Sequence, residues 1–260
     1  MANYARLLLE TALRAKRLDQ TLTSTIAPLA GSEAAPSATG IDALDRLLRG
    51  GLPQGQLSEV TGPPSSGRTT LALQVVASAT ARGEIAAYID TFDRLDVASA
   101  AAAGVALDRL LWVRGQAISR TDAGTALRER TLERALKSLM LVLQAGGFGV
   151  VVIDLADVPM AALRQLPPAT WLRVQRAVEG HETACVLLAP EPLARSAGGL
   201  TLALTAHPEW RGASARSRVM SGVQVDARVI SPRRRTTDTF SVSAQHAWAA
   251  MPPAVCAGGQ

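Results

Sequence analysis

The chain of 260 residues contains very little lysine, cysteine, histidine and aromatic side chain. It has two lysines, two cysteines and three histidines, and aromatic residues make up 3% of the chain. Cys185 lies inside an apolar run and Cys256 lies near the end, so they form neither a metal-ligand cluster nor a disulfide framework. The histidines at 181, 207 and 246 are too scattered to favour zinc chemistry. The sequence therefore argues against a disulfide-stapled fold and against a zinc site.

Long hydrophobic runs are also missing. No apolar run reaches the roughly 20 residues that a membrane-spanning helix needs. Near its start the chain carries Arg6, Glu10 and Arg14, where a signal peptide needs an uninterrupted apolar segment. We therefore expect a cytoplasmic protein without a membrane partner.

Hydrophobic residues and arginine are abundant in the chain. Hydrophobic residues make up 48% of the chain and charged residues 19%, which is typical of one large globular domain, alone or with appendages. The 27 basic residues outnumber the 22 acidic ones, the net charge is +5, and only Lys16 and Lys137 among the basic residues are not arginine. This excess favours an anionic partner.

The sequence divides into four parts. Residues 1–24 place apolar side chains at helical spacing opposite a face of Arg and Glu, which predicts an amphipathic helix. Residues 25–39 are rich in Ser, Thr, Ala, Pro and Gly without periodicity, which predicts a flexible linker. Residues 40–246 are expected to form the folded core, and residues 247–260 a loose tail. The helix either packs on its own core or docks on another protein.

Strand-like and helix-like segments alternate through the core. The alternation predicts an α/β fold with a mostly parallel central sheet that helices cover on both faces. Short connections between the last strand-like runs predict antiparallel neighbours, so the mixed sheet is expected to finish as a β meander. The predicted strands span 56–61, 85–91, 110–113, 148–153, 183–189, 200–206, 219–230 and 239–243, and the predicted helices span 69–82, 96–103, 122–145 and 169–179.

The strongest functional signal lies between the first predicted strand of the core and the helix after it. Residues 62–70 read GPPSSGRTT, which has the spacing of a Walker A phosphate-binding loop except at one position. Glycines in such a loop let successive backbone N–H groups point into one concavity, and the helix N-terminus adds its dipole. The predicted nucleotide-binding residues are Gly62, Ser65, Ser66, Gly67, Arg68, Thr69 and Thr70.

The exception in this loop is Arg68, which stands where a lysine is expected. Lysine is a compact point charge that reaches the β and γ phosphates, whereas a guanidinium is planar, bulkier and suited to bidentate contacts. The exchange either reflects the arginine bias of the chain and leaves nucleotide binding partly intact, or marks a loop kept for its packing. Neither interpretation favours fast catalysis.

An apolar strand that ends in a carboxylate follows further along the chain. Residues 150–154 read VVVID and have the form of a Walker B segment, in which Asp154 holds magnesium through water. Thr69 is the second predicted magnesium ligand, because a hydroxyl at that position of the loop holds the metal. The two segments together predict ATP with Mg2+ as the cofactor of a degenerate site.

These segments resemble the RecA-like superfamily. The runs GIDALD at 40–45, GGLPQG at 50–55 and LSEVTG at 57–62 lead into the loop and are similar to the start of the RecA core. Within the superfamily the chain most resembles the ImuA family, the RecA-like accessory proteins of bacterial damage-induced mutagenesis. The resemblance implies a RecA-like phosphate-loop core.

The resemblance also indicates that catalytic parts are altered. The catalytic glutamate that follows the second strand in RecA falls on Phe92, whose ring cannot accept a proton, and Asp93 is the candidate substitute base. The γ-phosphate sensor falls on Leu188–Gly199, where Ala and Pro replace the expected polar residue. The first DNA-binding loop falls on Leu155–Pro168, whose Pro and apolar residues favour packing or a protein contact.

The function that the resemblance implies is that of a scaffold in the bacterial DNA damage (SOS) response and error-prone translesion synthesis, with weak or no ATP hydrolysis. The implied partners are ImuB, its error-prone polymerase and RecA, and the helix over 1–24 is expected to support binding to these or to a second copy. Two alternatives stay open. The chain could be an active DNA-dependent ATPase, or a filament-capping regulator of recombination or cell division.

A basic stretch between residues 211 and 235 is the last signal. Its arginines favour sequence-independent binding to a nucleic-acid backbone, and a solvated hairpin face in an arginine-rich chain is the alternative. The candidate DNA-binding residues are Arg211, Arg216, Arg218, Arg228, Arg233, Arg234 and Arg235.

Overall fold

The computed structural model describes residues 35–117, 124–194, 199–212, 217–230 and 239–245. The predicted N-terminal helix over 1–24 and the predicted tail over 247–260 lie outside these ranges, as does most of the predicted linker. All the described residues belong to one compact unit, which begins at Ala34. No described helix is both long and apolar enough to cross a membrane.

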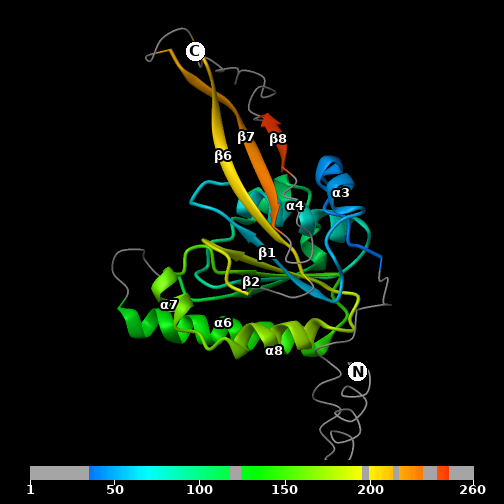
Figure 1. The fold of residues 1–260 in the computed structure, drawn as a ribbon, viewed down its shortest axis with the longest axis vertical. Helices are drawn as coiled ribbons and strands as arrows, with labels where there is room; N and C mark the ends of the chain where they lie inside the picture. Colours follow the sequence, from blue (N-terminus) through cyan, green and yellow to red (C-terminus); the bar gives the residue numbers. More distant parts are fainter. Residues whose placement is uncertain (1–34, 118–123, 195–198, 213–216, 231–238, 246–260) are drawn as a thin grey trace, which may run out of the picture. The chain divides into compact units, whose positions relative to one another are not determined.

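An eight-stranded sheet in the order β3-β2-β4-β5-β1-β6-β7-β8 forms the centre of this unit (Figure 1). Six neighbouring strands, from β3 to β6, run parallel, and β7 and β8 complete the sheet antiparallel to their neighbours. This confirms the predicted mixed, mostly parallel sheet that finishes as an antiparallel meander. The strands are β1 Gln56–Thr61, β2 Ala86–Asp90, β3 Leu110–Arg114, β4 Val150–Asp154, β5 Ala184–Ala189, β6 Thr201–Arg211, β7 Val219–Ile230 and β8 Thr239–Gln245.

The prediction that short connections make all the last strands antiparallel is wrong for β5 and β6. Strand β5 lies between β4 and β1 and is parallel to both, and β6 is parallel to β1. All residues of β5 are buried, which fits a strand that helices cover on both faces. The connection to β6 is short because β6 begins opposite Glu59, only two residues before β1 ends. The chain therefore does not have to return to the amino ends of the strands before β6 begins.

The start of β6 also explains the long hairpin. Because β6 begins near the carboxyl end of β1, most of β6 extends past that end, and β7 pairs with it over its whole length. The pair projects beyond the parallel part of the sheet (Figure 1). A β-bulge between Glu209 and Trp210 interrupts the register near the end of this hairpin.

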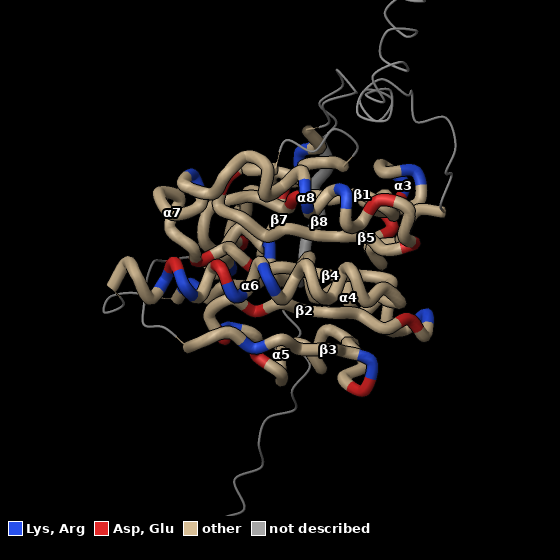
Figure 2. The backbone as a smooth tube through the Cα atoms, turned by 90° about the horizontal axis from the view of Figure 1, so that it is seen from below, with Lys and Arg blue, Asp and Glu red and all other residues tan. Residues whose placement is uncertain are grey.

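Helices cover both faces of the parallel strands. On one face lie α3 (Asp42–Leu48), α4 (Arg68–Ala81) and α5 (Val97–Ala102), and on the other lie α6 (Thr125–Ala145), α7 (Met160–Arg164) and α8 (Ala169–Val178). Figure 2 shows α6 and α8 along the sheet, with basic residues along α6. A short 3-10 helix, η1 (Leu107–Arg109), precedes β3.

Two apolar clusters follow from strand alternation. In β4, Val150 and Val152 belong to the cluster under α4, whereas Val151 and Ile153 belong to the cluster under α6 and α8. The buried thiol of Cys185 lies in this second cluster, where burial raises its pKa to about 12. The apolar stripe of α6 is buried at Leu132, Leu139 and Leu143.

The beginning of α6 differs from its prediction. The helix begins at Thr125 after Gly124, and no side chain caps it. Residues 122 and 123 of the predicted helix lie outside the described residues. The helix ends at Ala145, as predicted, and Gly146 is its C-cap with a φ of +67°.

Residues 35–39, which were expected in the flexible linker, instead pack on the core. Ser37 and Leu52 exchange backbone N–H···O bonds of 2.8 Å, and a Cβ on Gly51 would collide with the Ser37 carbonyl. Thr39 is fully buried, and its hydroxyl and N–H donate to Asp45 Oδ1 at 2.7 and 2.8 Å. The amino-acid composition did not reveal this packing, because small polar residues suit both a flexible linker and a hydrogen-bonded segment that leads into a folded core.

Candidate nucleotide-binding site

The predicted phosphate loop joins the carboxyl end of β1 to the first residue of α4, as the sequence indicated. Gly62 backs onto β6 so closely that a Cβ there would lie 2.5 Å from the Leu204 carbonyl oxygen. Ser65 has a φ of +62° and Gly67, the N-cap of α4, a φ of +91°. Two left-handed residues at a helix start shape a concave loop of backbone N–H groups, which is an arrangement suited to anions.

Two buried polar atoms in this loop lack a hydrogen-bond partner. They are the hydroxyl of Ser66, which is 1% exposed, and Nη1 of Arg68, which is 6% exposed. Burying a polar group without a partner is costly, so each atom indicates a ligand. A phosphate group accepts from both a hydroxyl and a guanidinium, and the residues of the loop therefore fit a phosphate. Thr69 and Thr70 are exposed in the first turn of α4.

Arg68 lies within electrostatic reach of two carboxylates. Burial lowers the pKa of its guanidinium, and the nearby charges of Asp154 and Asp157 act in the opposite direction. Asp157 also pairs with Arg94 at 3.6 Å. An arginine remains protonated in proteins even where burial disfavours the charge, so Arg68 is a buried cation beside the phosphate loop.

Asp154, the predicted Walker B carboxylate, ends β4 beside β2. Its Oδ2 accepts a 2.8 Å hydrogen bond from the Tyr88 hydroxyl, and its Oδ1 accepts a 2.9 Å bond from the Ala156 N–H. Burial raises the pKa of Asp154, and burial beside Asp154 raises the pKa of Tyr88 well above its ordinary value. Both carboxylate oxygens therefore already act as acceptors within the chain.

Phe92 occupies the position that the resemblance gives to the catalytic glutamate. Its side chain is 6% exposed and belongs to the apolar cluster with Leu132 and Leu139 of α6. The neighbouring Asp90 is fixed as well, because it accepts from the N–H groups of Arg94 at 2.8 Å and Leu95 at 2.7 Å. These contacts give both side chains a structural role.

Asp93, the candidate substitute base, is paired with Arg114 of strand β3. The two carboxylate oxygens accept from Nε and Nη2 at 2.8 and 2.9 Å, and the guanidinium lies 4.5 Å from the centroid of the Trp112 ring. The hydrogen bonds from Arg114 lower the pKa of Asp93. A carboxylate with a lowered pKa is a weaker base, so this geometry does not favour proton abstraction by Asp93.

The segment after β5, the predicted γ-phosphate sensor, is held by Glu59 of β1. The Glu59 carboxylate is 1% exposed and accepts from the N–H groups of Leu193 and Ala194, each at 2.7 Å, and from the Thr201 hydroxyl at 3.0 Å. The Gly62 N–H also donates to the Pro190 carbonyl at 3.3 Å. The segment is thus connected to the strand and loop that would hold phosphate, although residues 195–198 lie outside the described part.

The segment 155–168, the predicted first DNA-binding loop, forms α7 and its flanks. Val158 and Leu163 are each 2% exposed in the cluster under α6. The apolar residues of this segment therefore pack, as the sequence indicated. Arg164 pairs with Glu191 of the segment after β5 at 2.8 Å.

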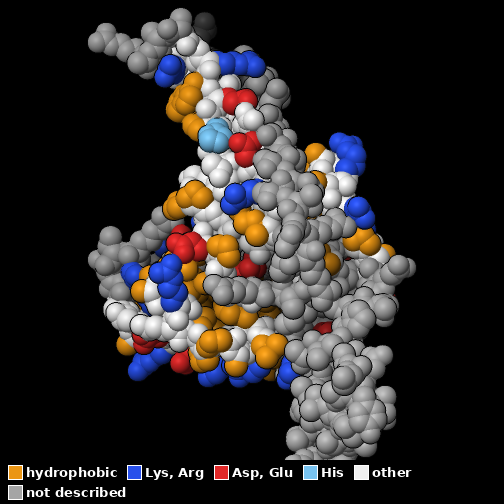
Figure 3. Space-filling view, in the orientation of Figure 1, with side chains coloured by type: hydrophobic (Ala, Val, Ile, Leu, Met, Phe, Trp, Pro, Cys, Tyr) orange, Lys and Arg blue, Asp and Glu red, His pale blue; other side chains and the backbone are white. Residues whose placement is uncertain are grey.

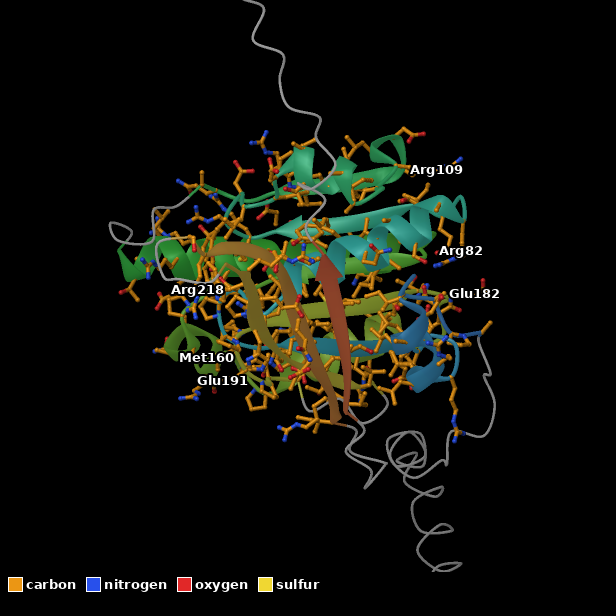
Figure 4. All side chains as sticks on the ribbon, turned by 90° about the horizontal axis from the view of Figure 1, so that it is seen from above. Arg82, Arg109, Met160, Glu182, Glu191 and Arg218 are labelled. Carbon is orange, nitrogen blue, oxygen red and sulfur yellow. The ribbon has the colours of Figure 1, made fainter. Side chains whose placement is uncertain are left out.

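The predicted DNA-binding arginines are spread along the hairpin. Arg211 ends β6 and Arg218 directly precedes β7, whereas Arg228 lies near the other end of β7, roughly 30 Å away at the usual rise of a strand. Arg216 and Arg233–Arg235 lie outside the described residues. Figure 4 shows Arg218 on the side of Met160 and Glu191, away from Arg82, Arg109 and Glu182. The end of the hairpin thus lies on the carboxyl side of the parallel strands.

The end of the hairpin also presents apolar side chains. Trp210 and Met220 pair across the strands and are 54% and 39% exposed, and Val219 beside Arg218 is 68% exposed. Figure 3 shows hydrophobic and basic side chains close together along the projecting hairpin. This combination suits a contact with either bases or a protein.

Sequence reasoning missed three site residues. Tyr88 gave no signal within its apolar strand, because only the pairing of β2 with β4 brings its hydroxyl to Asp154. Arg114 became relevant only through its pairing with Asp93. Glu59 carried a usable signal, since a charged residue inside an otherwise apolar predicted strand requires a partner.

A comparison with protein families adds to this geometry. The model of the RecA N-terminal domain matches residues 25–165, which is just over half of the chain. The chain belongs to the RecA family. Its matched segment includes the phosphate loop, Phe92 and Asp154.

Individual relatives support the same family. The chain is 43% identical to the RecA protein of Desulfotalea psychrophila over 118 residues, 44% identical to that of Bifidobacterium breve over 117 residues, and 42% identical to that of Mycobacterium ulcerans over 128 residues. These segments cover 45%, 45% and 48% of this chain but only 29%, 26% and 33% of the relatives. The chain thus matches about a third or less of the length of these relatives.

Proposed function

We propose that this RecA-family chain is an accessory protein of the bacterial DNA damage response that binds nucleotide and hydrolyses it weakly or not at all. The observation that carries the proposal is the burial of Phe92 where the catalytic glutamate is expected. Hydrolysis needs a group that orients and deprotonates the attacking water. Phe92 cannot do this, and Asp93 is bound to Arg114.

Retained nucleotide binding has separate support. The backbone of the phosphate loop keeps its glycines and left-handed residues, and the unpartnered atoms of Ser66 and Arg68 fit a phosphate. ATP is the nucleotide we propose. Binding without efficient turnover would let the ligand order the segment after β5, which contacts the loop through Gly62 and Pro190.

The role in translesion synthesis rests on the resemblance to the ImuA family. In this role the chain would bind ImuB, its error-prone polymerase and RecA, and the predicted helix over 1–24 would dock on one of them or on a second copy of this chain. Exposed apolar residues at the end of the β6–β7 hairpin support a binding role. Their neighbours Arg211 and Arg218 support a contact with DNA as well.

An active DNA-dependent ATPase is the second candidate, and the preserved loop favours it. The deciding experiment measures magnesium-dependent ATP turnover of the full chain with and without single-stranded DNA, beside the Arg68→Lys variant. We expect no stimulated turnover in either protein, because Arg68→Lys leaves Phe92 in place. Arg173→Lys on the exposed face of α8 is the matched control. DNA-stimulated turnover by the wild type would replace the accessory role with the ATPase.

Partner binding needs its own test. The full chain and a variant without residues 1–24 would be recovered from cells after DNA damage, with the captured proteins identified and the solution mass of each variant measured. We expect mutagenesis polymerase components or RecA with the full chain and their loss with the deletion. Equal capture and equal mass for both variants would contradict docking through the helix, and a filament-capping role predicts capture of RecA or a division protein alone.

A further inference from the structure

The carboxylate that should help to hold magnesium is occupied from within the chain. Tyr88 donates its hydroxyl to Asp154 Oδ2, and the Ala156 N–H occupies Oδ1. Each oxygen keeps some capacity to accept, but a water that bridges to a metal would have to share a buried carboxylate with these donors.

A positively charged side chain, that of Arg68, lies near the same carboxylate. Arg68 is 6% exposed, the charges of both Asp154 and Asp157 act on it, and Nη1 has no hydrogen-bond partner. The acidic pair that would attract a divalent ion therefore already has a positive neighbour. Nη1 of this guanidinium has no hydrogen-bond acceptor in the described part of the chain.

From these two observations we infer that the phosphate loop binds a nucleoside di- or triphosphate without magnesium, with Arg68 as the counter-charge for the phosphates. The inference rests on the proposed nucleotide binding and specifies its ligand as the metal-free polyphosphate. The residues fit the phosphate, but they fit Mg2+ poorly: Thr69 still offers a hydroxyl, yet both oxygens of Asp154 already accept hydrogen bonds from Tyr88 and Ala156.

The chemistry of arginine makes this exchange reasonable. A guanidinium offers parallel N–H donors that match two phosphate oxygens, whereas an ammonium offers a single point charge. The Ser66 hydroxyl and the N–H groups of the loop would bind further oxygens. Binding would then depend on fixed charge in the chain and would not vary with the magnesium concentration.

The wild-type chain provides the first test. Calorimetric titrations with ATP and with ADP would be carried out in buffer with magnesium and in the same buffer with EDTA. We expect dissociation constants that agree within about twofold between the two buffers. Inorganic tripolyphosphate in EDTA should also raise the unfolding temperature, because it supplies the phosphates without a base or a sugar.

Two variants separate the roles of the residues. Arg68→Ala should weaken ATP binding in EDTA by about tenfold to a hundredfold, the usual contribution of charge-assisted hydrogen bonds. Tyr88→Phe frees Asp154 Oδ2 and should make the affinity magnesium-dependent, with binding about tenfold tighter in magnesium than in EDTA. Arg173→Ala, on the exposed face of α8, should match the wild type in both buffers. The unfolding temperature of each variant shows whether it is folded.

The outcomes distinguish this inference from the proposed function. Equal wild-type affinity for ATP in the two buffers, together with weaker ATP binding by Arg68→Ala, supports binding without magnesium. Wild-type binding that is at least about tenfold weaker in EDTA overturns metal independence but leaves nucleotide binding intact. If neither ATP, ADP nor tripolyphosphate binds in either buffer, both metal independence and the proposed nucleotide binding are overturned. If Tyr88→Phe fails to fold, the wild type and Arg68→Ala still decide the question.

Discussion

Glu59 and Leu193 are joined by a 2.7 Å hydrogen bond from the Leu193 N–H to a fully buried carboxylate, across 134 residues of sequence. The same oxygen accepts from the Ala194 N–H, and the other accepts from the Thr201 hydroxyl. Glu59 thereby connects the strand that leads into the phosphate loop to both ends of the 190–200 connection.

Replacement of Glu59 should loosen this connection. Glu59→Ala leaves two N–H groups and a hydroxyl without their acceptor and should lower the free energy of unfolding by about 3 kcal/mol or more. Glu59→Gln keeps one carbonyl oxygen for the two N–H groups and should cost only about 1 kcal/mol. Urea unfolding gives the two values, and hydrogen exchange at 193 and 194 should rise most in Glu59→Ala. Equal losses in the two variants would contradict an acceptor role.

Gly62 should tolerate no side chain. A Cβ there would lie 2.5 Å from the Leu204 carbonyl and close to Ser66, in a backbone conformation with a φ of +155° that L residues rarely adopt. Gly62→Ala should therefore cost about 2 kcal/mol or more and weaken nucleotide binding. The control is Gly124→Ala, where nothing lies within 4 Å, and its effect should stay within about 1 kcal/mol. Thermal unfolding of both variants makes the comparison.

Phe92→Glu should not restore catalysis. The new carboxylate would enter the apolar cluster beneath α6, so the free energy of unfolding should fall by about 3 kcal/mol relative to the wild type. Phe92→Leu keeps the side chain apolar and should lose only about 1 kcal/mol. Unfolding curves and ATP turnover would be measured on the same preparations. Fast turnover in a stable Phe92→Glu protein would show that the position still faces the nucleotide.

The Asp93–Arg114 pair should respond to acid. Arg114 lowers the pKa of Asp93 from its ordinary value of 3.8, so the folded state favours the ionised carboxylate. The stabilisation is present above this ordinary value, which applies to the unfolded chain, and is lost as the pH falls through the lower folded pKa. In Arg114→Ala the carboxyl resonance of Asp93 should titrate closer to its ordinary value by NMR. An unchanged titration midpoint would show that Arg114 does not act on the carboxylate in solution.

DNA binding should depend on the end of the β6–β7 hairpin. Joint replacement of Arg211 and Arg218 by Ala should weaken binding of single-stranded DNA, and each lost phosphate contact should reduce the salt slope by about 0.7. Trp210→Ala should weaken binding without changing the slope, because stacking involves no ion release. Fluorescence anisotropy at several salt concentrations measures both quantities. Arg173→Ala serves as control, and equal binding by all the variants would leave the hairpin arginines as a solvated face.

The sequence alone determined the features that depend on local chemistry. The GPPSSGRTT loop between a strand and a helix predicted the phosphate loop, since its glycines and its spacing act within nine consecutive residues. Alternating apolar segments predicted the α/β class, and the RecA resemblance predicted that Phe92 stands in place of the catalytic glutamate. The direction of β5 and β6 was mispredicted. A short connection does not reveal whether the next strand begins at the amino or the carboxyl end of its neighbour, and β6 begins near the carboxyl end of β1.

Only the tertiary structure decided how the site residues are engaged. Tyr88 and Asp154 are 66 residues apart, and Asp93 and Arg114 are 21 apart, yet strand pairing brings each pair into contact. Neither pairing leaves a local pattern, because hydrogen bonds between neighbouring strands depend on register and burial and not on spacing along the chain. The sequence thus predicted where phosphate would bind, and the packing of β2, β3 and β4 decided which carboxylates already accept hydrogen bonds within the chain.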